Sequence, residues 1–195
     1  MPRQGLNRES VVEASIQFIE EKGYTAFSMG ELAKSLNVKT ASLYNHVESV
    51  DALFTEVGLA AVSQMVASET QAIKGKEKND ALFAIAAAYR TFAKDHNELY
   101  RVIMSLQKSK NKVLERAAGQ ITEPILQVLS GYGLSRVEQI HWQRILRSMM
   151  HGFVAHEELG GFSHYPADKN ESYQMAVQCI ADGLQNVKKE QNEDR

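Results

Sequence analysis

Apolar residues recur at the spacing of an α-helix along most of the chain. The most regular segment is 142–154, in which seven apolar residues fall at i, i+3, i+4, i+7, i+8, i+11 and i+12 and form one broad stripe on a helix. A second stripe repeats the pattern over 173–187. Alternation of apolar and polar residues with β-branched enrichment, which is typical of strands, is absent. The sequence therefore predicts an all-α protein without a sheet.

Residues suited to helix ends divide this pattern into separate helices. Ser28 and Ser135 are each followed three residues later by Glu, the capping-box pattern. Asn37 tolerates a left-handed backbone and so predicts a tight turn. The segment 109–131 contains Pro124, where we expect its helix to kink or restart. Helices are expected to begin near Asn7, Ser28, Lys39 or Thr40, Ser49, Asn79, Glu98, Ser135 and Asp168.

The chain has 195 residues and only three prolines, and no Gly-, Ser- or Pro-rich stretch separates two halves. That length suits one large domain or two small ones with a real core. Because a linker is absent, two domains would share a continuous helix. We therefore expect a three-helix domain at 1–48, joined by a long helix to a helical bundle, the two together forming a second domain at 49–190.

The N-terminal residues carry no apolar run after the basic ones, as a secretory signal would. We identify no segment with the roughly 20 apolar residues that span a bilayer. The single cysteine, Cys179, cannot form an internal disulfide, and we interpret it as a small buried hydrophobic residue. These features predict a cytoplasmic protein with no membrane partner.

Two short predicted helices lie within 28–47 and are joined by a turn of three or four residues; the segment reads SMGELAKSLNVKTASLYNHV. The small residue Ala33 stands where they would cross, as in a helix-turn-helix unit. The second helix is mostly small and polar on its outer side, so it can enter the major groove of DNA. The alternative is a helical hairpin packed in a bundle, with Tyr44 as a core aromatic residue.

The same stretch resembles the N-terminal domain of the TetR family of transcriptional regulators, over roughly residues 6–60. The shared pattern comprises Phe27-Ser28-Met29, Leu32-Ala33, Leu43-Tyr44-x-His46-Val47 and Ala52-Leu53. The resemblance implies a ligand-responsive repressor. Such a protein binds a pseudo-palindromic operator in double-stranded DNA as a dimer, and leaves it when a small molecule binds.

By this resemblance, the start of the second short helix contacts bases and the residues after it contact phosphates. Lys39 could donate to guanine acceptors, and the methyl groups of Thr40 and Ala41 could meet a thymine methyl. The hydroxyl and imidazole side chains that follow would bind phosphates, as would Ser28 and the backbone amides beside it. The implied DNA contacts are Ser28, Lys39, Thr40, Ala41, Ser42, Tyr44 and His46.

The charge of this segment departs from that of most DNA-binding surfaces, which are basic. Residues 1–50 hold five Lys or Arg and six Glu, and the whole chain has a net charge of -2. Val50 also stands where many family members carry a Lys. DNA affinity must therefore come from local placement of charge. The rival hypothesis is an all-α ligand-binding or enzymatic dimer that no longer binds DNA.

The segment 147–158, RSMMHGFVAHEE, is similar to the His-Gly-hydrophobic motif of one group of TetR C-terminal domains. In that group the last two long helices form the dimer interface. The wide stripes at 142–154 and 173–187 also favour a homodimer, with an intramolecular core as the alternative. Gly152 would let two helices approach closely. The expected interface residues are Met149, Met150, Phe153, Val154, Val177, Ile180 and Leu184.

The resemblance further implies an inducer pocket between helices of the C-terminal domain. The candidate lining residues are Tyr89, Phe92, Tyr100, Met104, Trp142 and Met149. Aromatic and Met residues at helical spacing are more often plain core, which is the alternative. Because no buried charged partner is evident among them, we expect a small apolar or aromatic ligand.

Neither an enzyme nor a metal site is indicated. His151 and His156 are five residues apart and diverge on a helix, and no HExxH pattern occurs. No Ser/His/Asp set, paired carboxylates or Gly-rich phosphate loop supports catalysis, and no cofactor is implied. We interpret the basic run at 108–116 as a solvated helix start.

Overall fold

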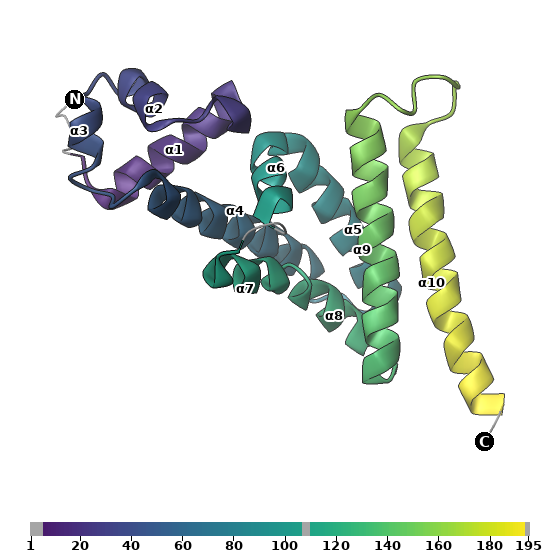
Figure 1. Ribbon diagram of the computed structural model, residues 1–195. Coiled ribbons are helices and arrows are strands. Elements are labelled where there is room, and N and C mark those ends of the chain that lie inside the picture. Colours follow the sequence, from purple (N-terminus) through teal and green to yellow (C-terminus); the bar gives the residue numbers. More distant parts are fainter. Residues whose placement is uncertain (1–5, 107–109, 194–195) are drawn as a thin grey trace. The chain divides into compact units, whose positions relative to one another are not determined.

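The structure is a computed structural model that describes residues 6–106 and 110–193, with side chains up to Val187. Within these ranges it holds ten α-helices, one short 3-10 helix and no strand (Figure 1). The all-α prediction is therefore confirmed. Residues 107–109, which include part of the basic run expected at 108–116, lie outside the described residues.

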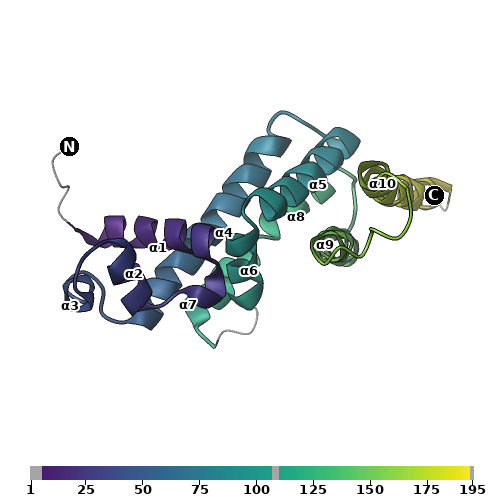
Figure 2. The same ribbon diagram turned by 90° about the horizontal axis from the view of Figure 1, so that it is seen from above.

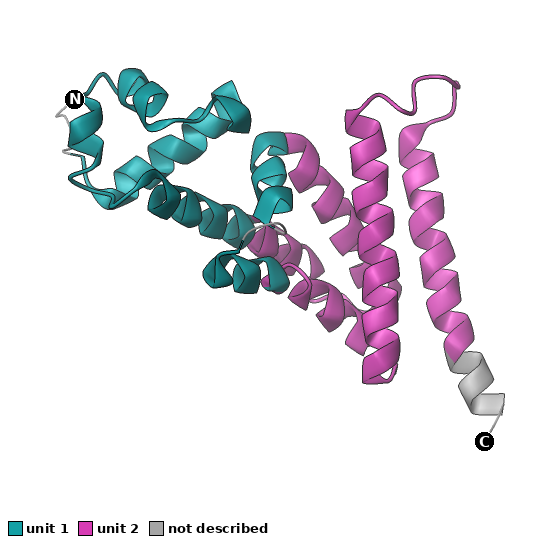
Figure 3. Cartoon of the chain, viewed as in Figure 1, with its two compact units in different colours: residues 1–64, 96–119 teal, residues 65–95, 120–195 magenta. Residues whose placement is uncertain are grey.

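The contacts divide the chain into two compact units (Figure 3). Unit 1 comprises residues 1–64 and 96–119, and unit 2 comprises residues 65–95 and 120–195. The long helix α4 (Val50–Ile73) contributes to both units. This division differs from the expected boundary at residue 49, because α6 (Asn97–Leu106) packs on α1 (Arg8–Lys22) and on the 3-10 helix (Tyr24–Ala26) of unit 1.

The first three helices of unit 1 enclose a small apolar core. They are α1 (Arg8–Lys22), α2 (Met29–Ser35) and α3 (Thr40–Leu43), with a 3-10 turn at Tyr24–Ala26 between α1 and α2. Their shared core consists of Val11, Phe18, Met29, Leu32, Ala33, Leu43, Val47 and Leu53. Residues from α1, α2, α3 and α4 all contribute, so this cluster holds α3 at a fixed angle to its neighbours.

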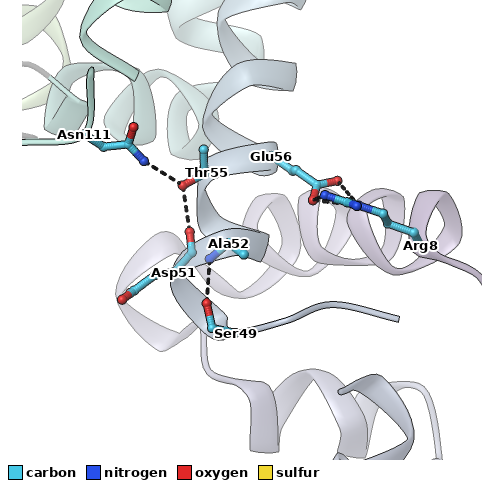
Figure 4. A network of polar contacts seen from close by, with 7 residues as sticks. All are labelled: Arg8, Ser49, Asp51, Ala52, Thr55, Glu56 and Asn111. Carbon is cyan, nitrogen blue, oxygen red and sulfur yellow. Dashed lines mark hydrogen bonds and ion pairs between the residues drawn. The ribbon is translucent and has the colours of Figure 1, made fainter. Parts of the chain in front are cut away.

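Polar contacts join the start of α4 to α1 within unit 1 (Figure 4). Arg8 donates from Nε and Nη2 to the carboxylate of Glu56 at 2.5–3.1 Å. Ser49 caps α4 by accepting from the amide of Ala52 at 3.0 Å, as expected. Asn111 donates to Thr55 Oγ1 at 3.2 Å and thereby attaches the start of α7 (Lys112–Gln120) to α4.

Within unit 1, α6 is held against the end of α1. The Glu98 carboxylate accepts from the backbone amide of Tyr24 at 2.7 Å, and His96 Nδ1 lies 2.5 Å from Glu20 Oε1. Gly58 on α4 makes room for leucines of α6 and α7, since a Cβ there would lie 3.1 Å from the side chains of Leu106 and Leu114.

Unit 2 is a helical bundle built from the end of α4 together with α5 (Lys78–Asp95), α8 (Glu123–Ser130), α9 (Arg136–Glu158) and α10 (Lys169–Glu193). α9 and α10 lie side by side in both views (Figures 1 and 2). The capping box of Ser135 and Glu138 forms in both directions, which confirms that prediction. Pro124 stands in the first turn of α8, where the helix restarts after α7.

Two expectations about single segments are wrong. Asn79 does not precede a helix, because α5 begins at Lys78; the Asn79 side chain instead accepts from Tyr132 Oη at 2.9 Å. From the sequence we also identified no segment that could span a bilayer, but α4 has the length and composition of a membrane span. In this fold, however, α4 supplies fully buried core residues such as Leu53, Val57 and Met65.

Candidate DNA-binding site

The turn between α2 and α3 is closed by backbone hydrogen bonds. Ser28 caps α2 by accepting from the Glu31 amide at 3.2 Å. Asn37 adopts the left-handed conformation expected of it, with φ of 54°. The amide of Val38 then donates to Ala33 O at 2.9 Å, which returns the chain toward the middle of α2. This short connection determines where α3 begins.

α3 is shorter than the sequence predicts. The sequence pattern predicts a helix from about Lys39 or Thr40 to His46. The observed α3 spans only Thr40–Leu43, and the amides of His46 and Val47 both bond to Leu43 O in a following turn, so the predicted end is wrong. Lys39 occupies the N-cap position without a capping side-chain bond, and Thr40 is the first helical residue. The first amides of any helix lack an intrahelical acceptor, and the Lys39 side chain does not supply one to α3.

The side chains of α3 and its turn separate into an inner and an outer face. Leu43 and Val47 are buried in the core of unit 1. Lys39, Thr40 and Ala41 are exposed, and Tyr44 is 48% exposed, which contradicts the alternative in which Tyr44 is a core residue. All seven implied DNA contacts are exposed or half-buried: Ser28, Lys39, Thr40, Ala41, Ser42, Tyr44 and His46.

The local charges are partly compensated. Lys34 Nζ lies 3.6 Å from Glu31 Oε1 on α2, and Arg8 pairs with Glu56. Lys39 has no ion-pair partner among the described residues and keeps its ammonium in solvent. A free cation at the start of α3 can interact with an anionic groove despite the acidic balance of the segment.

The six candidate ligand residues are divided between the two units. Tyr100 and Met104 belong to unit 1, whereas the other four belong to unit 2. Tyr89, Phe92 and Tyr100 are buried, and the remaining three are half-buried. The ring of Trp142 packs closely on α10 at Gly183, where an added Cβ would lie 2.6 Å from it. Sequence reasoning also missed a buried ionisable group: the side chain of Glu69 is 0% exposed in unit 2.

Most of the expected interface residues are core residues of the single chain. The buried set comprises Met150, Val154, Val177, Ile180 and Leu184. Phe153 is half-buried and contacts the rings of Phe162 and Tyr173, with centroids 4.7 and 4.9 Å apart. The buried members of the stripes at 142–154 and 173–187 therefore belong to the core of unit 2, whereas Ile145 of the first stripe is 48% exposed.

Two further positions differ from expectation or add to it. Cys179 is exposed, so its interpretation as a buried hydrophobic residue is wrong. Arg90 on α5 donates to both carboxylate oxygens of Glu157 at 2.7 and 2.8 Å, an interaction that sequence reasoning missed. Its partner lies 67 residues away, which no local pattern indicates. In the part of the chain that the structure describes, no group of three or more potential metal ligands occurs.

A small helical core that presents a short helix with a polar outer face, followed by an all-helical bundle, defines a helix-turn-helix DNA-binding regulator. The family model for the tetR family of bacterial regulatory proteins matches residues 11–57, and that for the tetracyclin repressor-like C-terminal domain matches residues 82–180. The chain belongs to the TetR family. It is accordingly a DNA-binding transcriptional regulator and not an enzyme.

Curated relatives agree. The HTH-type regulator Rv0681 of Mycobacterium tuberculosis is 30% identical over 80% of this chain and 72% of its own length. YobS of Bacillus subtilis is 28% identical over 94% of this chain and 95% of its own. The negative regulator IcaR of the biofilm operon icaADBC in Staphylococcus aureus is 33% identical over 25% of this chain and 26% of its own, and covers 49 residues.

Solved structures share the fold at low sequence identity. A protein of unknown function from Rhodococcus sp. RHA1 matches with a TM-score of 0.81 at 17% identity, over 94% of this chain and 97% of its own. A possible TetR family regulator from Streptomyces coelicolor A3(2) matches with a TM-score of 0.68 at 15% identity, over 93% of this chain and 100% of its own. Identities this low establish the fold alone.

Proposed function

We propose that the protein is a cytoplasmic repressor that binds a pseudo-palindromic operator as a homodimer and is released by a small molecule. The observation that carries the DNA-binding part is the outer face of α3: Lys39, Thr40, Ala41 and Tyr44 are exposed while Leu43 anchors the helix in the core. The repressor role is supported by the similarity of one quarter of the chain to the negative regulator IcaR.

The DNA contacts can be tested by variants in a salt-dependent mobility shift with the DNA upstream of the protein's own gene. Tyr44→Phe and His46→Ala are expected to weaken binding to all sequences alike, because phosphate contacts carry no sequence information. Lys39→Ala is expected to relax preference at one base pair by about 1–3 kcal/mol if Lys39 contacts guanine.

A matched control is Lys74→Ala, which removes an exposed lysine outside the helix-turn-helix. It should bind DNA like the parent. If the three test variants also bind like the parent, the assignment of α3 as the recognition helix is wrong. If the parent shows no salt-dependent binding to any DNA, the rival hypothesis of a ligand-binding dimer without DNA affinity replaces it.

We place the homodimer contact on the outward sides of α9 and α10. Ile145 on α9 is 48% exposed and Met175 on α10 is 69% exposed, although both are large apolar side chains. Apart from its own helix backbone, no atom of the described residues lies within 4 Å of where a Cβ of Gly152 would be, so another helix can approach closely there. Together with the exposed Cys179, these residues supply an apolar strip for a symmetric four-helix contact.

This contact predicts that the parent sediments as a dimer at micromolar concentration. Ile145→Glu and Met175→Glu should each shift it toward monomer, since a charge would be buried without a partner. Their far-ultraviolet circular dichroism should stay unchanged. Tyr165→Glu is the control, because Tyr165 is exposed and lies in the loop before α10. A dimer that withstands both charges would place the interface elsewhere.

Release by a ligand requires coupling between the helical bundle and α3. α6 follows α5 directly and contacts α1 and the 3-10 turn of unit 1, where Glu98 accepts from the Tyr24 amide. We therefore propose that a ligand that shifts α5 displaces α6 and with it α1, or changes the orientation of α4. A coupling free energy of roughly 1–3 kcal/mol lowers DNA affinity 5–150-fold.

A further inference from the structure

Unit 2 contains a cavity of about 640 Å³, open to solvent on one side, between α5 and the start of α10 and next to the end of α9. Its volume lies within the range of small-molecule sites, about 300–1,000 Å³. It is lined by Phe83, Ala87, Arg90, Thr91, Lys94, Glu157, Asn170, Tyr173, Gln174 and Val177. None of the six ligand residues expected from the sequence lines it.

The two helices run antiparallel along this cavity. Tyr173 Oη donates to Ala86 O at 2.7 Å, and Arg90 Nη1 donates to Asn170 Oδ1 at 3.0 Å, so residue numbers rise on α5 as they fall on α10. Phe83 and Val177 therefore lie toward one end, and Lys94 and Asn170 toward the other. The cavity has an apolar end and a polar end.

Arg90 is fixed at the polar end. Besides its two bonds to Glu157 and one to Asn170, its guanidinium lies 5.3 Å from the ring centroid of Phe153 and 4.9 Å from that of Tyr173. Its side chain is only 16% exposed. The hydrogen bonds from Arg90 lower the pKa of Glu157, so this carboxylate stays ionised and neutralises Arg90.

Lys94 supplies the uncompensated charge. It stands one turn beyond Arg90 on α5, and within the described residues it has no salt-bridge partner. Because Arg90 and Glu157 cancel, the lining residues carry one net positive charge. Two of the five guanidinium N–H groups of Arg90 are also unused by its three bonds. The polar end thus offers one cation and several donors.

We propose that this cavity binds a monocarboxylic acid with an extended apolar body. The carboxylate would contact Lys94 and the donors beside it, and the apolar body would lie along Ala87 toward Phe83 and Val177. Phe83 and Lys94 are eleven positions apart on α5, which is roughly 16 Å of helix. The site therefore favours a medium-chain or arylalkyl acid over acetate or butyrate. The proposal that the acid is an effector rests on the proposed ligand-controlled function. The proposal that the acid binds in this cavity does not depend on that function.

The test is isothermal titration of the full-length protein with octanoate, butyrate and octan-1-ol. Octanoate is expected to bind most tightly. Lys94→Met should lower octanoate affinity about tenfold, because it removes a charge-assisted contact, and should leave octan-1-ol unchanged. Phe83→Ala should weaken octanoate more than butyrate. Lys74→Met is the control, since it removes an exposed lysine that does not line the cavity.

The proposal is overturned if octanoate does not bind the parent at millimolar concentration. It is equally overturned if Lys94→Met and Phe83→Ala both bind octanoate like the parent while remaining folded by circular dichroism. A mobility shift with and without octanoate separates the two proposals. Binding that leaves DNA affinity unchanged supports the site and removes octanoate as an effector. If the protein binds DNA but not octanoate, the proposed acid site is wrong and the proposed function as a regulator is unaffected.

Discussion

Replacing Glu69 with methionine is expected to raise the free energy of unfolding by about 3 kcal/mol at pH 8. Glu69 lies on α4 between Met65 and Ile73, one turn from each, on a buried apolar stripe. Its side chain is 0% exposed, and neither carboxylate oxygen has a hydrogen-bond partner among the described residues. Burying an unsatisfied polar group is costly, and methionine fills a similar volume without one.

The expected size and its pH dependence follow from the pKa of Glu69. Burial raises this pKa from 4.5 to about 8, although Arg147 on α9 opposes the shift. Between pH 4.5 and 8 the folded protein therefore holds a proton that the unfolded chain has released. Stability falls as pH rises through this window and levels off above it. The full shift would correspond to more than 4 kcal/mol, which solvent relaxation reduces.

Chemical denaturation of the parent and two variants at pH 5, 6.5 and 8 checks this. Glu69→Gln removes the ionisation but keeps a buried polar group, whereas Glu69→Met removes both. As pH rises, the free energy of unfolding of both variants should increase relative to that of the parent. Glu69→Met should be the more stable of the two variants at every pH. A parent-to-Glu69→Gln difference that is constant from pH 5 to 8 would show that the Glu69 pKa is ordinary in the folded protein.

Replacing Gly183 with alanine is expected to lower the free energy of unfolding by about 2 kcal/mol. A Cβ at this position on α10 would lie 2.6, 3.4 and 3.5 Å from three ring atoms of Trp142 on α9. An indole ring is rigid, so α9 and α10 would have to separate or the ring would have to change rotamer. Alanine favours a helix over glycine by about 1 kcal/mol, and the clash outweighs this gain.

A double-mutant cycle isolates the contact. In a Trp142→Leu background the clash is gone, so Gly183→Ala should become neutral or stabilising by urea denaturation. Gly119→Ala on α7 is the matched control, since a Cβ there would meet no atom within 4 Å among the described residues outside its own helix. It should be neutral or stabilising in the parent itself. If Gly183→Ala lowers the free energy of unfolding equally with and without Trp142, the indole ring is not what disfavours a larger side chain at this position.

The amino-acid sequence by itself determined the local features, because their causes act within a few residues. The capping box of Ser135, the left-handed turn at Asn37 and the cap of Ser49 each depend on groups two to four positions apart. The helical periodicity predicted an all-α fold for the same reason. The candidate site at 28–47 could also be predicted from the sequence, because a helix-turn-helix unit is a continuous segment whose outer residues follow from helix geometry.

Only the tertiary structure decided what each apolar stripe packs against. Periodicity shows that a face is buried but not whether the chain itself or a second copy covers it, so the stripe of Met150 and Val154 was assigned to a partner although it lies in the core. The pairing of Arg90 with Glu157, the carboxyl group of Glu69 inside the bundle and the fit of Trp142 over Gly183 join helices distant in sequence. Such contacts arise when helices with separate local patterns assemble, and nothing within one helix encodes its partner's position.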